Sequence, residues 1–94
     1  MSVFKLTEFT TQDMSKLVEF AENLREDVAA AGAEFIDVIS VGDGKCIVIA
    51  KFANQAQMEA STEINNAAFG KMIAAGLVNA DSIIRRSGEV VYSF

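Results

Sequence analysis

Two stretches rich in isoleucine and valine lie on either side of a short glycine-containing turn in the middle of the chain. Residues 34–41 (EFIDVISV) and 45–52 (KCIVIAKF) flank Gly42-Asp43-Gly44, a pattern typical of a β-hairpin. A two-residue turn would place Asp37 on an otherwise apolar face, whereas a three-residue loop with Gly44 at positive φ collects the charged side chains on one face. Because burying a carboxylate without a partner is unfavourable, we expect the second register.

A strand and a helix are predicted before this hairpin. Residues 2–9 alternate weakly between apolar and polar side chains and are interpreted as a strand. The segment Thr10-Thr11-Gln12-Asp13 then opens a helix that ends near Gly32, with a Thr as the source of the capping oxygen and the acid that follows it favouring the positive end of the helix. The apolar stripe of this helix recurs at intervals of three, four and seven residues and consists of Met14, Leu17, Val18, Ala21, Leu24 and Val28.

A helix and a strand are predicted after the hairpin. Asn54, with Gln57 three residues later, resembles a capping box, and the helix is expected to run to about Gly76 with Gly70 as its weak point. Residues 89–94 (EVVYSF) predict the last strand, while residues 82–86 fit either an early part of that strand or a short helix. The order βαββαβ predicts one α+β domain over residues 1–94, a four-stranded antiparallel sheet with both helices on one face.

Both faces of the predicted sheet are apolar, although the helices can cover only one of them. The face expected beneath the helices carries Phe4, Leu6, Ile36, Val38, Cys46, Val48, Ala50 and Phe52. The opposite face would carry Val3, Phe9, Phe35, Ile39, Val41, Ile47 and Ile49, with Lys5, Thr7, Asp37 and Lys51 as its polar exceptions. Such a patch exceeds the few hundred Å² that a soluble monomer usually exposes. A second copy of the chain, packed sheet on sheet, is the simplest cover.

Charge and composition exclude several classes of function. The net charge of -5 disfavours nucleic acid as a partner. The chain has no His and a single Cys, so neither a metal site nor a bound cofactor is expected. No segment resembles a signal peptide or a membrane-spanning helix, and the free thiol suits the cytoplasm. We therefore expect a cytoplasmic protein that binds no membrane.

Five residues are candidates for ligand binding, each with a structural alternative. Ser61 and Asn65 lie one helical turn apart within a wide apolar arc, so they either face a pocket or serve the helix itself. Asp37 and Lys51 could form a charge pair in a cleft or rim residues of a dimer interface. Tyr92 could donate a hydrogen bond to a ligand or be a structural aromatic.

Two further features have structural interpretations. Cys46 lies on the predicted helix-covered face and is expected to be an inert buried thiol. Arg85-Arg86 could bind an anion, but a solvated turn is the simpler interpretation.

The element order, the doubly apolar sheet and the segment FANQAQMEASTEINNAAFGKM resemble the dimeric α/β-barrel superfamily, and within it the antibiotic-biosynthesis-monooxygenase-like proteins. The resemblance implies a ferredoxin-like fold that dimerises into an α/β barrel. Phe52 stands where those proteins often have Trp, and Asn54 stands at their polar cap. Ser61 and, approximately, Asn65 stand where their His residues are expected, so a haem-binding or His-dependent activity is not implied.

Three hypotheses about function remain open at this point. The chain could form a small dimer whose cavity binds a mostly apolar molecule without catalysis. It could be a cofactor-independent oxygenase or isomerase of the monooxygenase type, with chemistry supplied by hydrogen-bonding side chains and the reactivity of the substrate. It could also be a structural dimer with no ligand. A shaped cavity with convergent polar groups would favour the first two.

Overall fold

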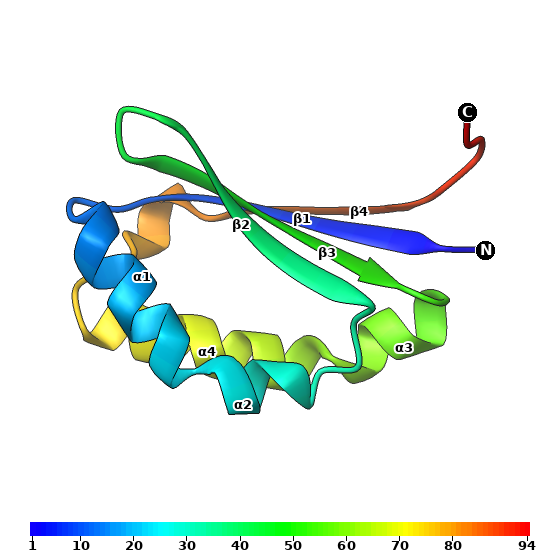
Figure 1. The fold of residues 1–94 in the computed structure, drawn as a ribbon, viewed down its shortest axis with the longest axis horizontal. Coiled ribbons are helices and arrows are strands. Elements are labelled where there is room, and N and C mark those ends of the chain that lie inside the picture. Colours follow the sequence, from blue (N-terminus) through cyan, green and yellow to red (C-terminus); the bar gives the residue numbers. More distant parts are fainter.

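The computed structural model describes all residues from 1 to 94. Along the chain lie β1 (Val3–Thr10), α1 (Met14–Asn23), α2 (Arg25–Ala29), β2 (Phe35–Gly42), β3 (Lys45–Phe52), α3 (Gln55–Ala60), α4 (Thr62–Ala74), a 3₁₀ turn (Ala80–Ser82) and β4 (Ile84–Glu89). The strands form one antiparallel sheet in the order β2-β3-β1-β4. All helices lie on one side of this sheet, and its other face is uncovered (Figure 1). The predicted α+β architecture is therefore confirmed.

The β2–β3 hairpin has the predicted grouping of faces but a different loop. Ile36 pairs with Ala50, and Val38 pairs with Val48, on the side that faces the helices. The connection is a two-residue turn, in which Asp43 and Gly44 both have positive φ (55° and 74°). A register shift between Ser40 and Gly42 inserts one extra residue into β2. This bulge has the same effect on the facing of the side chains as the expected three-residue loop. The bulge thus keeps Asp37 off the helix-covered face.

The faces predicted for β1 were wrong. Val3 pairs with Phe52 and Phe9 pairs with Cys46, and all four side chains are buried beneath the helices. Lys5 and Thr7 share this side by alternation. Phe4 and Leu6, expected under the helices, are on the uncovered face instead. We call this uncovered face the open face; its apolar residues are Phe4, Leu6, Phe35, Ile39, Ile47, Ile49 and Ile84.

The last strand lies earlier than predicted. β4 covers Ile84–Glu89, and its pairing with β1 runs from Ile84 opposite Glu8 to Glu89 opposite Val3. β1 begins at Val3, so residues 90–94 have no strand left to pair with, apart from one hydrogen bond from Val90 N–H to the Ser2 carbonyl oxygen (2.8 Å). The ambiguous segment 82–86 contains both structures, because the 3₁₀ turn ends at Ser82 and the strand begins at Ile84.

Each predicted helix is divided into two by a tight turn. The Asp13 side chain caps α1 by accepting a hydrogen bond from Lys16 N–H, and Asn54 caps α3 by accepting from Gln57 N–H. The first helix breaks at Leu24 and the second at Ser61. Gly70, expected as the weak point, lies inside α4 without interrupting it.

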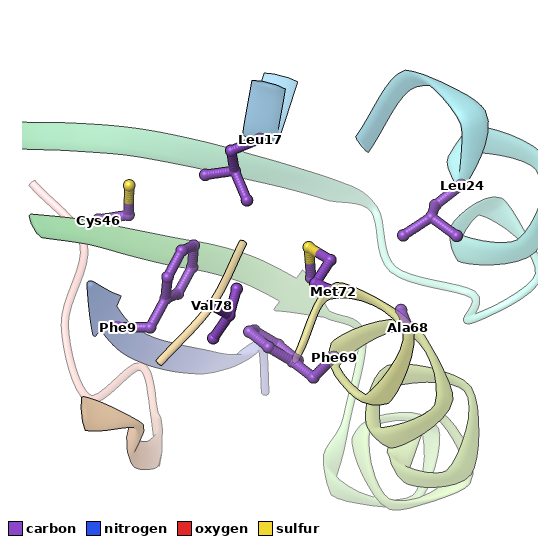
Figure 2. Packing of buried hydrophobic residues seen from close by; sticks show 8 residues of the cluster. All are labelled: Phe9, Leu17, Leu24, Cys46, Ala68, Phe69, Met72 and Val78. Carbon is purple, nitrogen blue, oxygen red and sulfur yellow. The ribbon is translucent and has the colours of Figure 1, made fainter. Parts of the chain in front are cut away.

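The hydrophobic core has two parts, both between the helices and the sheet. The larger contains Phe9, Leu17, Leu24, Cys46, Ala68, Phe69, Met72 and Val78, which Figure 2 shows gathered between the strands and α4. The smaller contains Val3, Ala50, Phe52 and Met58. Only 16 of 94 residues are buried, so much apolar surface remains outside these clusters.

Candidate functional site

A cleft separates the helices from the β2 side of the sheet. It encloses a cavity of about 640 Å³, within the range of small-molecule sites, and 14 of its 18 lining residues are hydrophobic. Val38 and Ser40 of β2 line it and are exposed, which leaves the cleft open along this edge. The lining residues are Phe9, Met14, Leu17, Val18, Ala21, Glu22, Leu24, Arg25, Val28, Ala29, Ala33, Ile36, Val38, Ser40, Val48, Asn65, Ala68 and Phe69.

Asn65 is the residue that lines this cleft with an amide side chain, and a hydrogen bond to Ser61 fixes the orientation of that amide. The Ser61 hydroxyl donates its single proton to the Met58 carbonyl oxygen (2.6 Å), so its Oγ can only accept from the Asn65 Nδ2 group at 3.1 Å. The Asn65 Oδ1 atom has no partner within the chain. Because no buried side-chain polar atom lacks a partner, this oxygen is reachable from outside. Asn65 lines the cleft with an acceptor and one N–H donor that the chain does not use.

The break in the helix at Ser61 helps to place Asn65. Ser61 is fully buried, and its hydroxyl bonds back to the carbonyl three residues earlier, a contact that commonly bends helices. The turn separates α3 from α4, and Asn65 follows one turn later on α4.

Phe69, one turn beyond Asn65, forms an aromatic wall of the cleft. Its ring packs edge-on against Phe9, with 5.7 Å between centroids. The Arg85 guanidinium carbon lies 5.8 Å from the Phe69 ring centroid. The ring is thus held by an aromatic neighbour and a cation–π contact, which favours a fixed wall.

Two charged lining residues were missed from the sequence. Arg25 and Glu22 form an exposed ion pair of 2.9 Å, and the Arg25 guanidinium holds the pKa of the Glu22 carboxyl below its usual value. Glu22 lies near the end of α1 and Arg25 begins α2, on either side of the break at Leu24. The available signal was the opposite charge at three-residue spacing, on a helix whose apolar face was already recognised.

The other three predicted site residues lie elsewhere. Asp37 and Lys51 both project from the open face, opposite Ile49 and Phe35, and Lys51 forms its ion pair with Glu34 (3.4 Å) rather than with Asp37. Tyr92 lies in the segment after β4. The structure therefore brings together Ser61 and Asn65 and separates them from the remaining candidates.

The arginine pair does not form a single anion site. Arg85 lies opposite Thr7 on the helix side, whereas Arg86 lies opposite Leu6 on the open face, 3.9 Å from Glu8. Both belong to β4, so the expected solvated turn was wrong as well.

Cys46 is 1% exposed, with its Sγ 3.6 Å from Met14 Sδ. Burial raises the pKa of the Cys46 thiol. Its predicted position beneath the helices is confirmed.

No three His, Cys, Asp or Glu residues come together in an arrangement that could hold a metal ion. None of the helices has the length and apolar character needed to cross a membrane.

No protein-family model matches the sequence, and no curated protein matches it. Solved structures do resemble it in fold. A dimeric ferredoxin-like protein from an uncultured marine organism is 18% identical, with a TM-score of 0.69 over 99% of this chain and 90% of the other. SnoaB, a cofactor-independent oxygenase from Streptomyces nogalater, is 9% identical, with a TM-score of 0.73 over 98% and 95%. A candidate antibiotic biosynthesis monooxygenase from Nitrosomonas europaea is 12% identical, with a TM-score of 0.68 over 97% and 91%.

At such low identity these similarities speak for the fold alone. They confirm the resemblance drawn from the sequence, because ferredoxin-like and monooxygenase-like structures both align along nearly the whole chain. The chain has the ferredoxin-like α+β fold found in dimeric proteins of this kind.

Proposed function

We propose that the protein is a cytoplasmic homodimer that binds a small, mostly apolar molecule in the cleft between the sheet and the helices. The observation that carries this proposal is the cavity of about 640 Å³ with apolar walls and the oriented Asn65 carboxamide. Apolar walls with a few placed polar groups are typical of small-molecule sites. The ligand would combine an apolar body with one hydrogen-bonding group for Asn65.

The dimer half of the proposal rests on the open face. Leu6, Phe35 and Ile39 are each close to 40% exposed on it, and Ile84 is 49% exposed. A contiguous apolar surface of this kind is typical of an interface. The dimeric ferredoxin-like structure with the same fold supports a partner that is a second copy.

A panel of drug-sized aromatic and aliphatic molecules, screened for shifts in melting temperature, tests ligand binding. The sharpest variant is Ala21→Trp, because Ala21 is an exposed helical alanine that lines the cavity. Ala56→Trp is the matched control, since Ala56 is an exposed helical alanine outside the cavity lining. We expect Ala21→Trp to abolish the shifts and Ala56→Trp to preserve them. Shifts that survive in both variants would place binding outside the cleft.

A second candidate function is a cofactor-independent oxygenase or isomerase. The observation that favours it is the likeness in fold to SnoaB combined with a hydrogen-bonding amide in the cleft. With no His in the chain, the protein would orient a reactive substrate through Asn65 rather than supply an imidazole base. Oxygen uptake and product analysis with the molecules that shift the melting temperature test this candidate. Binding without turnover would contradict the oxygenase or isomerase function and support the binding function.

A further inference from the structure

The last five residues leave the sheet as an apolar segment with little contact to the rest of the chain. We call Val90–Phe94 the C-terminal arm. Beyond the hydrogen bond from Val90 N–H to Ser2, Val91 is 88% exposed, Tyr92 is 71% exposed and Phe94 is fully exposed. Figure 1 shows the arm bending away from the sheet beyond the end of β4. The strongest aromatic contact of Tyr92 is with Phe94 itself, with ring centroids 4.8 Å apart.

The arm borders a second hollow, of about 550 Å³, at the same end of the sheet. Its other walls are Met1, Ser2, Phe4 and Lys51. Phe4 and Lys51 belong to the open face, opposite one another in the β1–β3 pairing. The arm, the hollow and the open face are therefore one continuous surface.

The area of the arm suits a role in an interface. Aromatic side chains bury about 150–250 Å² each, so covering Tyr92 and Phe94 would remove roughly 300–500 Å² of surface. A standard interface takes about 800 Å² from each partner. The arm would thus supply a large part of what a stable dimer needs, and the open face the rest.

We propose that the C-terminal arm packs against a second copy of the chain and forms part of the dimer interface. This inference rests on the proposed dimer and adds a segment that stabilises it. In a two-fold dimer each such contact is made twice, so the contribution of a short arm to the free energy of association is doubled. A membrane is a poorer occupant, because the chain carries a net charge of -5 and the arm has no charged side chain to attract anionic lipids.

The protein contains a direct reporter of the arm. Tyr92 is the only Tyr and there is no Trp, so the intrinsic emission of the native chain comes from the arm. Acrylamide quenching of this emission should be measured over a range of protein concentrations that spans dimer dissociation. We expect the quenching constant to fall at least threefold as the dimer forms, and to stay high at all concentrations in the Ile49→Asp variant.

Two other outcomes would overturn the inference. A quenching constant that is low at every concentration, also in Ile49→Asp, would mean that the arm folds back on its own subunit. A constant that stays high in the dimer, or falls only when phosphatidylcholine or phosphatidylglycerol vesicles are added, would show that the second copy does not cover it.

Truncation gives an independent measurement. A chain ending at Glu89 and the double variant Tyr92→Ser/Phe94→Ser should dimerise at least tenfold more weakly than the full chain in sedimentation equilibrium. Ala67→Ser is the control, because Ala67 is an exposed apolar residue of α4, on the helix side of the sheet and outside the cleft lining. The dissociation constant of this variant should stay within twofold of that of the full chain. A truncated chain that dimerises as tightly as the full chain would refute the arm while leaving the dimer intact. A full chain that never dimerises would refute the proposed dimer itself.

Discussion

The hydrogen bonds around Asn65 give a specific expectation for its substitution. Asn65→Leu removes the bond to Ser61 and the free Oδ1 acceptor together. The free energy of unfolding should change by about 0.5–1.5 kcal/mol, the usual net value of one hydrogen bond. For any molecule found to bind the cleft, the loss of binding free energy should be larger than the change in the free energy of unfolding.

Asn66→Leu is the matched control for Asn65→Leu, since Asn66 is the exposed neighbour outside the cavity lining. Calorimetric titration and chemical unfolding of both variants provide the measurement. Equal affinities in the two variants would assign Asn65 a purely structural role.

Cys46 provides a second expectation, because its thiol is almost completely buried and its pKa is raised. A thiol reacts as the thiolate, so both properties slow modification. Reaction with a disulfide reagent such as dithionitrobenzoate should be at least a hundredfold slower in the native protein than in guanidinium chloride. Rapid labelling of the native protein would show that the core around Met14 opens readily.

Gly44 is the glycine of the hairpin turn that is also closely packed against the rest of the chain. Gly44 has a φ of 74°, its carbonyl accepts from Thr11 N–H at 2.8 Å, and an added Cβ would lie 2.5 Å from the Thr11 carbonyl oxygen. Gly44→Ala should therefore lower the free energy of unfolding by about 1–3 kcal/mol, the usual range for a strained backbone. Gly70→Ala, at an exposed helical position with open space around it, should raise it by about 0.5–1 kcal/mol. Urea unfolding of the two variants compares them directly, and equal effects would contradict the strain argument.

The elements that sequence analysis placed correctly are those with a strong local signal. Asn54 caps its helix and Gly44 has positive φ in the hairpin turn, both as expected, because these features depend on neighbouring residues. The first helix begins where it was expected, although its cap is Asp13 rather than a Thr. β1 has no such signal, because both sides of the strand carry apolar and polar residues. Its facing is decided by pairing with β3, which is remote in sequence.

β4 shows the same limit more clearly. Residues 84–89 (IRRSGE) have a weaker strand pattern than residues 89–94 (EVVYSF). The position of β4 is set by the span of β1 that is available for pairing, which begins at Val3. Tertiary pairing thus outweighs local preference for the last strand.

For the whole molecule, element order predicted the fold, whereas the residues that line the cleft were predicted only in part. Ser61 and Asn65 were paired from the sequence because they are four residues apart, and they lie one turn from each other although Ser61 is the break between α3 and α4. Two residues that line the cleft were missed, Glu22 and Arg25. Three residues that lie away from it were grouped with Ser61 and Asn65, namely Asp37, Lys51 and Tyr92. Both errors arise because the position of a cleft depends on the distance between α1, α4 and the sheet. Helical and strand periodicity indicate on which side of a helix or strand a residue lies, but not the distance between the helices and the sheet.

The proposed dimer can be tested by placing a charge on the open face. Ile49 is half-buried on this face, between Leu6 and Asp37, so Ile49→Asp would place a carboxylate at the centre of the proposed interface and beside an existing one. An uncompensated charge in a buried interface costs roughly 3 kcal/mol or more, which corresponds to about a hundredfold weaker dissociation constant. Sedimentation velocity should show monomer at concentrations where the unmodified chain is dimeric, with circular dichroism confirming that the variant is folded. Val38→Asp is the control, because Val38 lies on the neighbouring strand of the same sheet but on the helix side, and it should remain a dimer. A folded Ile49→Asp dimer would show that the two copies meet through another surface.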